Sequence, residues 1–423
     1  MTLSLRLREQ GFEVSLMESG LNLGGLTSPA RIGNYTWDQF YHVILASDTN
    51  LISLFEQLNL KDEIHWEQTK TGFFTEGHLY SMSDIIEFLT FPPLALIDKL
   101  RLGFTIFYAS KIKSWERLEE ISVTDWLIQL SGNHTFQKIW LPLLKSKLGE
   151  NYRLSSASFI WAIIARMYAA RRSGLKKEMF GYVKGGYATI LSRFENFLSE
   201  GGVHVTCGAP IIRIENDKSG VNVNGAHGKV MRFDDVILTV PSNKISSICP
   251  ELSLQEKKRL DGVNYQGVIC LALILKKPFP GYYVTNITDE WVPFTGVIEM
   301  TAVVNQDHFD GNSLVYLPRY LPQEDAFWNK SDDEIQGKFI KALELMYPSF
   351  SKDDVLASKI TRASHVHPIT TINYSRELLP PTQTSLNHVF IVNSAQIANG
   401  TMNVNEIIGL ANRKSKEIKK LLS

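Results

Sequence analysis

The sequence contains few cysteines and no cysteine pair at metal-binding or redox spacing. Its three thiols, Cys207, Cys249 and Cys270, lie far apart in the chain. A disulfide framework and a cysteine-rich zinc site are therefore excluded, which suits a reducing compartment. His365 and His367 are close in sequence, but no third ligand lies at a spacing that would complete a metal site with them. We therefore expect no bound metal ion.

The chain also lacks an excess of charge of either sign. Lysine and arginine together number 44, and aspartate and glutamate together number 44, so the formal net charge is zero. This balance argues against a protein that binds nucleic acid through general positive charge, and against an acidic tail. We expect the partner to be a small-molecule substrate and not a nucleic acid.

Long hydrophobic runs are absent as well. No segment reaches the roughly 20 apolar residues that a membrane-spanning helix needs. The two best candidates, 88–97 and 154–165, are predicted to be buried helices, and Pro92 and Pro93 interrupt the first. Charged residues, beginning with Arg6, stand where the apolar part of a signal peptide would lie. The sequence therefore predicts a cytoplasmic protein without a membrane span, and it leaves open a peripheral contact with a membrane surface.

The chain of 423 residues has room for two or three domains, and its first residues carry a recognisable pattern. Residues 2–10 have helical spacing, Gly11 ends that helix, and 12–18 alternates as a strand does before it closes on Glu18. These features form the second half of a βαβ unit that binds a dinucleotide, in which the acid accepts hydrogen bonds from ribose hydroxyls. A solvated acid at a strand end is the plainer interpretation of Glu18 taken alone.

The residues after this strand resemble a known superfamily, that of flavin-containing amine oxidases, protoporphyrinogen oxidases and phytoene desaturases. The residues that carry the resemblance, in order and near the family spacing, are Gly24, Gly25, Gly33, Asp38 and His42. The resemblance implies FAD as the cofactor and a part in its binding for Glu18, Gly24, Gly25 and Asp38. Paired glycines permit the close approach of the backbone to a pyrophosphate, where any Cβ would intrude.

One part of the family pattern is missing. Family members begin with a strand and a GxGxxG loop, whereas this chain starts inside the helix that follows the third glycine. The resemblance therefore implies an FAD-binding domain that is incomplete at its N-terminus, through a start codon placed too late or a truncated product. Without that loop, the cofactor pyrophosphate would lose its main cradle of backbone N–H groups.

The C-terminal segment resembles the same family. A strand at 387–393 leads through a glycine-containing loop into a helix at 404–421, whose N-terminus faces the flavin pyrimidine in relatives. Free N–H groups and the positive helix end stabilise negative charge on reduced flavin. The further cofactor-binding residues that the resemblance implies are Ile211, Pro241, Asn393, Gly400, Thr401, Met402 and Asn403.

The interior carries no catalytic motif of the nucleophile-elbow, P-loop, HExxH or paired-carboxylate kind. Amine-oxidising relatives carry a lysine beside the flavin on the strand at 267–277, and Cys270 occupies that position here. A typical amine oxidase is thus disfavoured, while the 11% aromatic content and the apolar helices favour an isoprenoid, tetrapyrrole or lipid-like substrate. His367 and Tyr374 are the candidates for a catalytic role, although a structural role is the plainer interpretation of His367.

Two other functions stay open at this point. A cluster of basic residues would suit the diphosphate of a nucleotide sugar in a mutase-like flavoprotein, although a solvated helix end is its plainer interpretation. The chain would alternatively be a truncated, non-catalytic protein that resembles a flavoprotein. The basic residues are Arg166, Arg171, Arg172, Lys176 and Lys177.

We therefore predict an α/β fold in which a Rossmann-like FAD-binding domain is interleaved with an α+β substrate domain. The FAD-binding domain takes 1–75, 181–245 and 375–423, and the substrate domain takes 76–180 for its helical part and 246–374 for its sheet part. The predicted function is that of an FAD-dependent oxidoreductase, of the oxidase or desaturase type. It would pass a hydride from a largely apolar organic substrate to flavin N5, and oxygen or a quinone would reoxidise the flavin.

Overall fold

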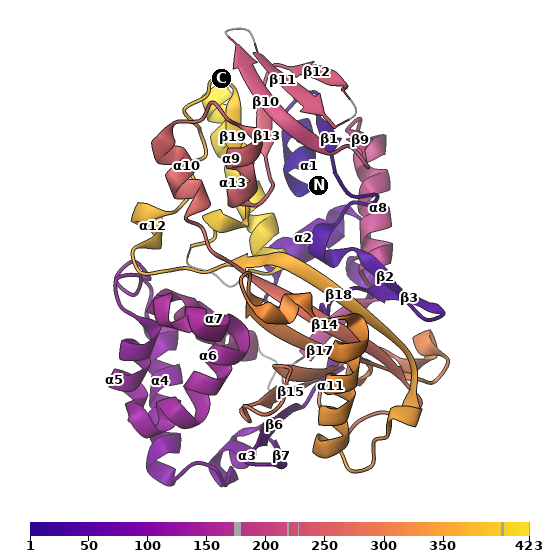
Figure 1. Cartoon of the computed structure of the whole chain (residues 1–423), viewed down its shortest axis with the longest axis vertical. Helices are drawn as coiled ribbons and strands as arrows, with labels where there is room; N and C mark the ends of the chain where they lie inside the picture. The colour runs from indigo at the N-terminus through magenta and orange to yellow at the C-terminus, as the bar shows by residue number, and fades with distance from the viewer. Residues whose placement is uncertain (173–178, 218–219, 227, 399–401, 423) are drawn as a thin grey trace.

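The computed structural model describes residues 1–172, 179–217, 220–226, 228–398 and 402–422 (Figure 1). The upper part in Figure 1 holds both chain termini, and the lower part holds a large sheet with helices beside it. The chain passes between the two parts several times, so neither part is one continuous segment.

Short parallel strands form the centre of the upper part. β1 (Ser15–Met17) pairs with β9 (His204–Thr206), and β13 (Val236–Leu238) pairs with β19 (Val389–Ile391). The two pairs are separate two-stranded sheets, whereas a Rossmann-like domain has one continuous parallel sheet. The mixed α/β class is confirmed, and the Rossmann-like arrangement stays a prediction, as do the domain boundaries.

Helices and an antiparallel sheet surround these strands. The N-terminal helix packs against the C-terminal one because Leu3 and Leu7 meet Leu410 and Ile418 in one apolar cluster. The elements of this part are α1 (Thr2–Glu9), α8 (Gly186–Glu200), α9 (Ser242–Ile248), α10 (Leu254–Asp261), α13 (Val404–Leu422), β10 (Ile211–Asp217), β11 (Gly220–Gly225) and β12 (Val230–Phe233).

A seven-stranded sheet, in the order β18-β14-β17-β16-β15-β6-β7, forms the centre of the lower part. Alternate residues of its buried strand β14 point to opposite faces. Ile269 and Leu271 belong to the cluster that packs against Phe339 of α11, and Cys270 belongs to the cluster on the other face. The elements are β6 (Thr71–Thr75), β7 (His78–Ser81), β14 (Tyr265–Leu275), β15 (Val284–Ile287), β16 (Gly296–Glu299), β17 (Ser313–Pro322), β18 (Val355–Pro368) and α11 (Asp332–Met346).

Helices from one continuous stretch lie beside this sheet (Figure 1). They are α3 (Ile85–Thr90), α4 (Leu96–Lys111), α5 (Val123–Thr135), α6 (Leu141–Leu148) and α7 (Ala157–Arg172). Shorter elements connect the two parts. They are α2 (Thr49–Gln57), α12 (Tyr374–Glu377), β2 (Pro29–Ile32), β3 (Tyr35–Asp38), β4 (Ile44–Leu45), β5 (Ile64–Gln68) and β8 (Met179–Val183).

The prediction that 88–97 is a buried helix was wrong. The segment is split between α3 and α4, and Leu89, Leu96 and Ile97 are 48%, 66% and 55% exposed. Proline blocks a continuous helix across this point, because it lacks an N–H group and restricts the residue before it. Within the described residues, no helix combines the length and the apolar character needed to cross a membrane.

Candidate functional site

Glu18 directly follows β1, and its carboxylate lies at the carboxyl end of the strand. Its Oε1 accepts hydrogen bonds from the Gly20 N–H at 2.7 Å and from the Ser19 hydroxyl at 3.2 Å. The Ala209 N–H donates to the Glu18 carbonyl at 2.9 Å, so the loop that leads to Ile211 lies beside the acid. The structure therefore brings two of the predicted cofactor-binding residues, Glu18 and Ile211, into one region.

Gly24 and Gly25 both have a left-handed backbone, with φ of 112° and 57°, but for different reasons. A Cβ on Gly24 would lie 2.5 Å from Leu191 Cδ1 of α8, so close approach of the protein itself requires glycine there. A Cβ on Gly25 would meet no heavy atom within 4 Å. Of the two, only Gly25 has open space beside its Cα.

Asp38, at the end of β3, is 2% exposed, and its Oδ1 accepts the Tyr187 N–H at 2.8 Å. This bond joins the N-terminal segment to α8. Burial raises the pKa of Asp38 to about 8, although the bond from Tyr187 acts in the opposite direction. Its neighbour His42 has Nδ1 4.0 Å from Oδ2 of Asp38, and burial lowers the pKa of His42 to about 4. Both side chains are therefore uncharged at neutral pH.

The variant Asp38→Asn tests this protonation state. A raised carboxyl pKa means that the folded protein keeps a proton that the unfolded chain has released, so the contribution of Asp38 to stability falls as pH rises from about 4 to about 8. The asparagine retains an acceptor for Tyr187 and removes this titration. Between about pH 5 and about pH 8, the free energy of unfolding measured with urea is expected to change in favour of the variant by at least roughly 2 kcal/mol relative to the wild type. Equal changes in the two proteins would contradict the assignment. Glu299, whose pKa is raised to about 7 by burial, titrates in both proteins, so its contribution cancels in the comparison.

The pairing of β13 with β19 brings Pro241 beside Asn393. The Asn393 Nδ2 donates to the Val240 carbonyl at 2.9 Å and to Ser242 Oγ at 3.2 Å. Its Oδ1 accepts the Ala395 N–H at 3.1 Å. These partners are all protein groups, so this side chain holds together the turns that follow the two strands.

The N-terminus of α13 meets the N-terminus of α2. Asn403 caps α13 by accepting an N–H from its first turn at 3.1 Å. The Asn405 Oδ1 accepts the N–H groups of Asn50 and Leu51 at 2.9 and 3.2 Å, at the start of α2. Two positive helix ends therefore lie at one point. Met402 is half-buried, and Gly400 and Thr401 lie outside the described residues.

Buried polar atoms without partners lie close to this point. Arg166 of α7 binds Asp48, immediately before α2, with an N–O distance of 2.8 Å. The ring of Tyr187 lies 5.1 Å from that of His42. The Tyr187 hydroxyl and Ser47 Oγ are buried, and neither has a hydrogen-bond partner in the described part of the chain. Such groups are costly unless a partner is supplied, so these orphaned hydroxyls fit a bound ligand.

A cluster of aromatic and polar side chains lies beside β14, β17 and β18 of the large sheet. The hydroxyls of Tyr41 and Tyr320 are 2.8 Å apart. The ring of His367 lies 6.1 Å from that of Tyr320 and stacks on Phe159 at 6.3 Å. Burial lowers the pKa of His367 to about 3, and its Nε2 has no partner among the described residues. Cys270 is 1% exposed, and burial raises the pKa of its thiol.

Tyr374, the other candidate for catalysis, is fully buried. Its hydroxyl donates to the Ala395 carbonyl at 2.8 Å, and burial raises its pKa. Because the hydroxyl already bonds to the backbone that follows β19, its geometry favours a structural role.

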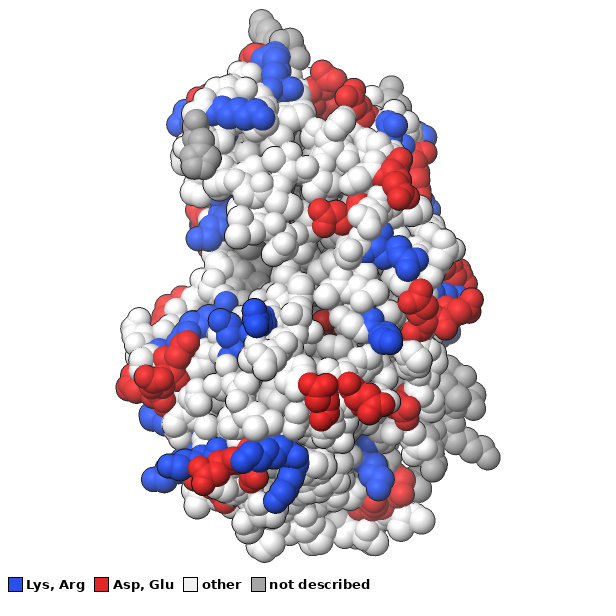
Figure 2. Space-filling view, turned by 90° about the vertical axis from the view of Figure 1, so that its right-hand side faces the viewer, with Lys and Arg blue, Asp and Glu red and all other residues white. Residues whose placement is uncertain are grey.

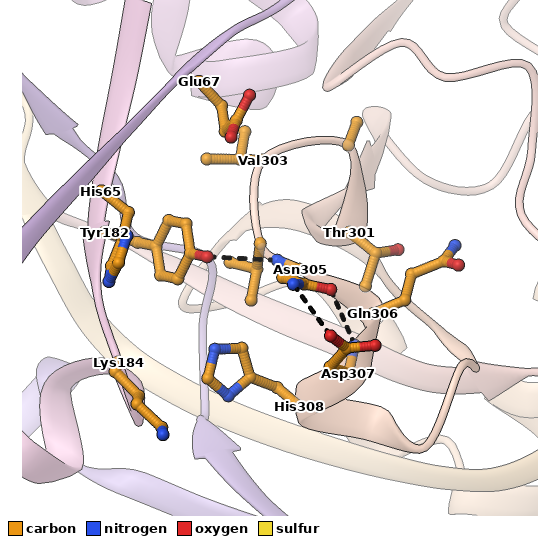
Figure 3. A pocket seen from close by; sticks show the side chains of 12 residues that line it. His65, Glu67, Tyr182, Lys184, Thr301, Val303, Asn305, Gln306, Asp307 and His308 are labelled. Carbon is orange, nitrogen blue, oxygen red and sulfur yellow. Dashed lines mark hydrogen bonds between the residues drawn. The ribbon is translucent and has the colours of Figure 1, made fainter.

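A pocket of about 610 Å³ opens between β5, β8 and the loop at 301–308 (Figure 3). Its lining includes the acids Glu67 and Asp307 and the base Lys184. Opposite charges line the same space, so charge alone selects no class of ligand for it. None of the residues predicted to bind the cofactor or to catalyse the reaction lines this pocket.

Parallel strand pairs, converging helix N-termini and unsatisfied buried hydroxyls are typical of a cofactor-dependent α/β enzyme. Residues 1–403 match the family of flavin containing amine oxidoreductases. The chain belongs to this family. It is therefore an FAD-dependent oxidoreductase, as predicted, and the family assignment favours this function over a non-catalytic protein.

Solved structures share the fold over nearly the whole chain. A triple mutant of putrescine oxidase has 17% identity and a TM-score of 0.76, and the match covers 99% of this chain and 96% of that one. A candidate protoporphyrinogen oxidase from Exiguobacterium sp. 255-15 has 16% identity and a TM-score of 0.74, with the same coverage. Cyclohexylamine oxidase from Brevibacterium oxydans IH-35A has 16% identity and a TM-score of 0.66, again with 99% and 96% covered. No curated protein matches the chain by sequence.

The structure adds residues to the site that the sequence did not single out. Tyr41 had a signal, since it adjoins the motif residue His42, and Tyr187 directly follows the glycine pair Gly185 and Gly186. Lys147 and Tyr320 had none, because only tertiary packing brings them together.

The predicted basic cluster is described only in part. Arg166 pairs with a buried acid, which differs from the solvated helix end expected for it. The side chains of Arg171 and Arg172 are not described, and Lys176 and Lys177 lie outside the described residues.

Proposed function

We propose that this FAD-dependent oxidoreductase is of the oxidase or desaturase type and takes a hydride from a C–H bond of a largely apolar organic substrate. The observation that carries the proposal is the group of aromatic side chains beside His367, with the uncharged Cys270 in place of a lysine on β14. Two of the similar structures, putrescine oxidase and cyclohexylamine oxidase, are oxidases by name, which supports oxidase chemistry in this fold.

The cofactor would lie along the residues that the upper part brings together. Glu18 offers a free carboxylate oxygen to a ribose, and Gly25 offers open space for the pyrophosphate. The paired N-termini of α2 and α13 offer positive potential, and the hydroxyls of Tyr187 and Ser47 offer unused hydrogen-bonding groups. When bound, FAD supplies the two-electron acceptor for the substrate hydride.

The side chains near His367 would position the substrate and exclude water. The rings of Tyr320, Tyr41 and Phe159 give aromatic walls, and the Tyr41–Tyr320 hydrogen bond fixes two of them. His367 is neutral because burial lowers its pKa to about 3, so its unpartnered Nε2 would orient a polar group of the substrate. The buried thiol of Cys270 stays protonated at neutral pH, since burial raises its pKa, and it adds no charge.

Anaerobic mixing of the FAD-loaded protein with candidate substrates tests this proposal. We expect the oxidised-flavin absorbance band to bleach with an apolar ring or polyene substrate, such as a protoporphyrinogen or phytoene, and not with putrescine. Free FAD mixed with the same compounds is the control for reduction without the protein. Bleaching by putrescine alone would contradict the proposed substrate class.

We also propose that α3 and α4 contact a membrane surface. The buried side of α4 carries polar residues, among them Asp98, Lys99 and Thr105. Apart from Arg101 and Lys111, its exposed residues are apolar and recur at helical spacing, which is the reverse of an ordinary surface helix. The exposed apolar residues of the two helices are Ile86, Leu89, Leu96, Ile97, Leu100, Phe104, Phe107 and Tyr108.

Basic residues at the end of α4 support a lipid surface as the partner. Lys111, Lys113 and Arg117 are exposed there, and Lys111 Nζ lies 5.1 Å from the centre of the Phe107 ring. An apolar helix face bordered by basic residues suits a membrane interface with anionic headgroups. By contrast, the view of another side in Figure 2 shows positive and negative side chains intermixed.

A further inference from the structure

A lysine without a counterion lies beside the proposed substrate region. Lys147, near the end of α6, has its Nζ 5.7 Å from the centre of the Tyr320 ring. It forms no hydrogen bond or ion pair with any other described residue, although its neighbour in the helix, Lys145, pairs with Glu290 at 2.7 Å. Among the described residues, the face of the Tyr320 ring is therefore the only attractive electrostatic partner of the Lys147 ammonium group.

The surroundings of Lys147 are crowded but not closed. Its side chain keeps solvent exposure, and yet burial lowers its pKa, with Arg166 as the next cause. The Lys147 ammonium group and the His367 ring both lie beside the Tyr320 ring, 5.7 and 6.1 Å from its centre. Lys147 is also the second cause, after burial, of the lowered pKa of His367.

The net charge around Lys147 is positive. Arg166 is neutralised by its ion pair with Asp48. His367 is uncharged at neutral pH, since burial lowers its pKa to about 3. Lys147 is thus the one charge of this group that no described residue balances, and an anion is the ligand that would balance it.

We propose that Lys147 binds an anionic group, a carboxylate, on the otherwise apolar substrate, with His367 Nε2 as a second polar contact. The inference rests on the proposed function for the identity of the ligand as a substrate. It narrows the substrate class from apolar compounds in general to aromatic or polyene acids. It also gives a reason why a protonated amine would bind poorly here, because its positive charge would meet the like charge of Lys147.

Three benzene derivatives of nearly equal shape test this inference by calorimetric titration of the FAD-loaded protein. Benzoate is anionic, benzamide is neutral and benzamidine is cationic. We expect benzoate to bind most tightly and benzamidine most weakly. The variant Lys147→Met is expected to weaken benzoate binding at least about tenfold while it changes benzamide binding little.

Matched variants separate the charge from the fold. Lys145→Met removes a lysine of the same helix that already has a partner, and it should leave benzoate binding unchanged. Lys147→Arg keeps the charge, and we expect it to retain most of the affinity for benzoate. If Lys147→Met fails to fold, Lys147→Gln takes its place. Benzoate binding no tighter than benzamidine binding, or equal losses in Lys147→Met and Lys145→Met, would overturn the inference.

The titration distinguishes this inference from the proposed function. Benzoate binding requires no turnover, so a protein that binds benzoate through Lys147 but never transfers a hydride would contradict the function alone. A protein that reduces its flavin with apolar substrates and shows no preference for benzoate would contradict the role of Lys147 alone.

Discussion

The variant Gly186→Ala is expected to lower the free energy of unfolding by roughly 2–5 kcal/mol and to lose bound FAD. Gly186 has φ of 63°, and a Cβ there would lie 2.7 Å from Asp38 Oδ1 and 3.3 Å from Trp37 Cε2. The methyl group would displace the carboxyl group that accepts the Tyr187 N–H, and it would leave buried polar groups unpaired. Urea unfolding and the flavin content of the purified variant measure the two effects.

Gly281 provides the matched control for this prediction. It has φ of 80°, but a Cβ at this position would meet no heavy atom within 4 Å. Gly281→Ala therefore adds only the cost of a left-handed backbone, roughly 1–2 kcal/mol, and it should keep FAD. If both variants lose the same stability and the same flavin, the contact between Gly186 and Asp38 is not what the site requires.

Replacing both Phe104 and Phe107 with glutamate is expected to weaken binding to anionic vesicles at least about tenfold. Both side chains project from α4, at 53% and 51% exposure, and inserting one phenylalanine into an apolar phase contributes about 1.5–3 kcal/mol. Because neither side chain is in the core, the free energy of unfolding should change little. Co-sedimentation with vesicles of mixed neutral and anionic lipid measures the binding.

The exposed Leu345 of α11 is the control for this second prediction, since it is 64% exposed and lies on another helix. Leu345→Glu should leave vesicle binding unchanged. Wild-type protein that fails to bind vesicles would contradict the membrane proposal. A second result would also contradict it. If the double variant binds vesicles as the wild type does but differs in oligomeric state by light scattering, the apolar face of α4 binds a second copy of the chain and not a membrane.

Much of the fold follows from local patterns in the sequence. The helix predicted at 2–10 is α1, and the predicted strand and helix at 387–393 and 404–421 are β19 and α13. Gly24 was also predicted to be required, but for a different reason. The sequence resemblance assigned its missing Cβ to a cofactor, whereas the structure places the side chain of Leu191 there.

The charge of the site could not be predicted, because it depends on contacts between distant segments. Asp38 is neutral through burial beneath α8, and Arg166 is balanced by an acid that lies before α2. In the folded protein Lys145 pairs with Glu290, whereas Lys147 pairs with no described acid. Nothing in the local sequence distinguishes these two lysines. The outward apolar face of α4 was missed for a related reason. Periodicity identifies the apolar face of a helix, but tertiary packing decides whether that face is inside.

The flavin content of the purified protein tests the central claim most directly. The protein is denatured, and the released flavin is separated and quantified against the amount of chain. We expect FAD in a one-to-one ratio with the chain, and the visible absorbance bands of a bound flavin before denaturation. A colourless protein that also takes up no FAD on titration would contradict it.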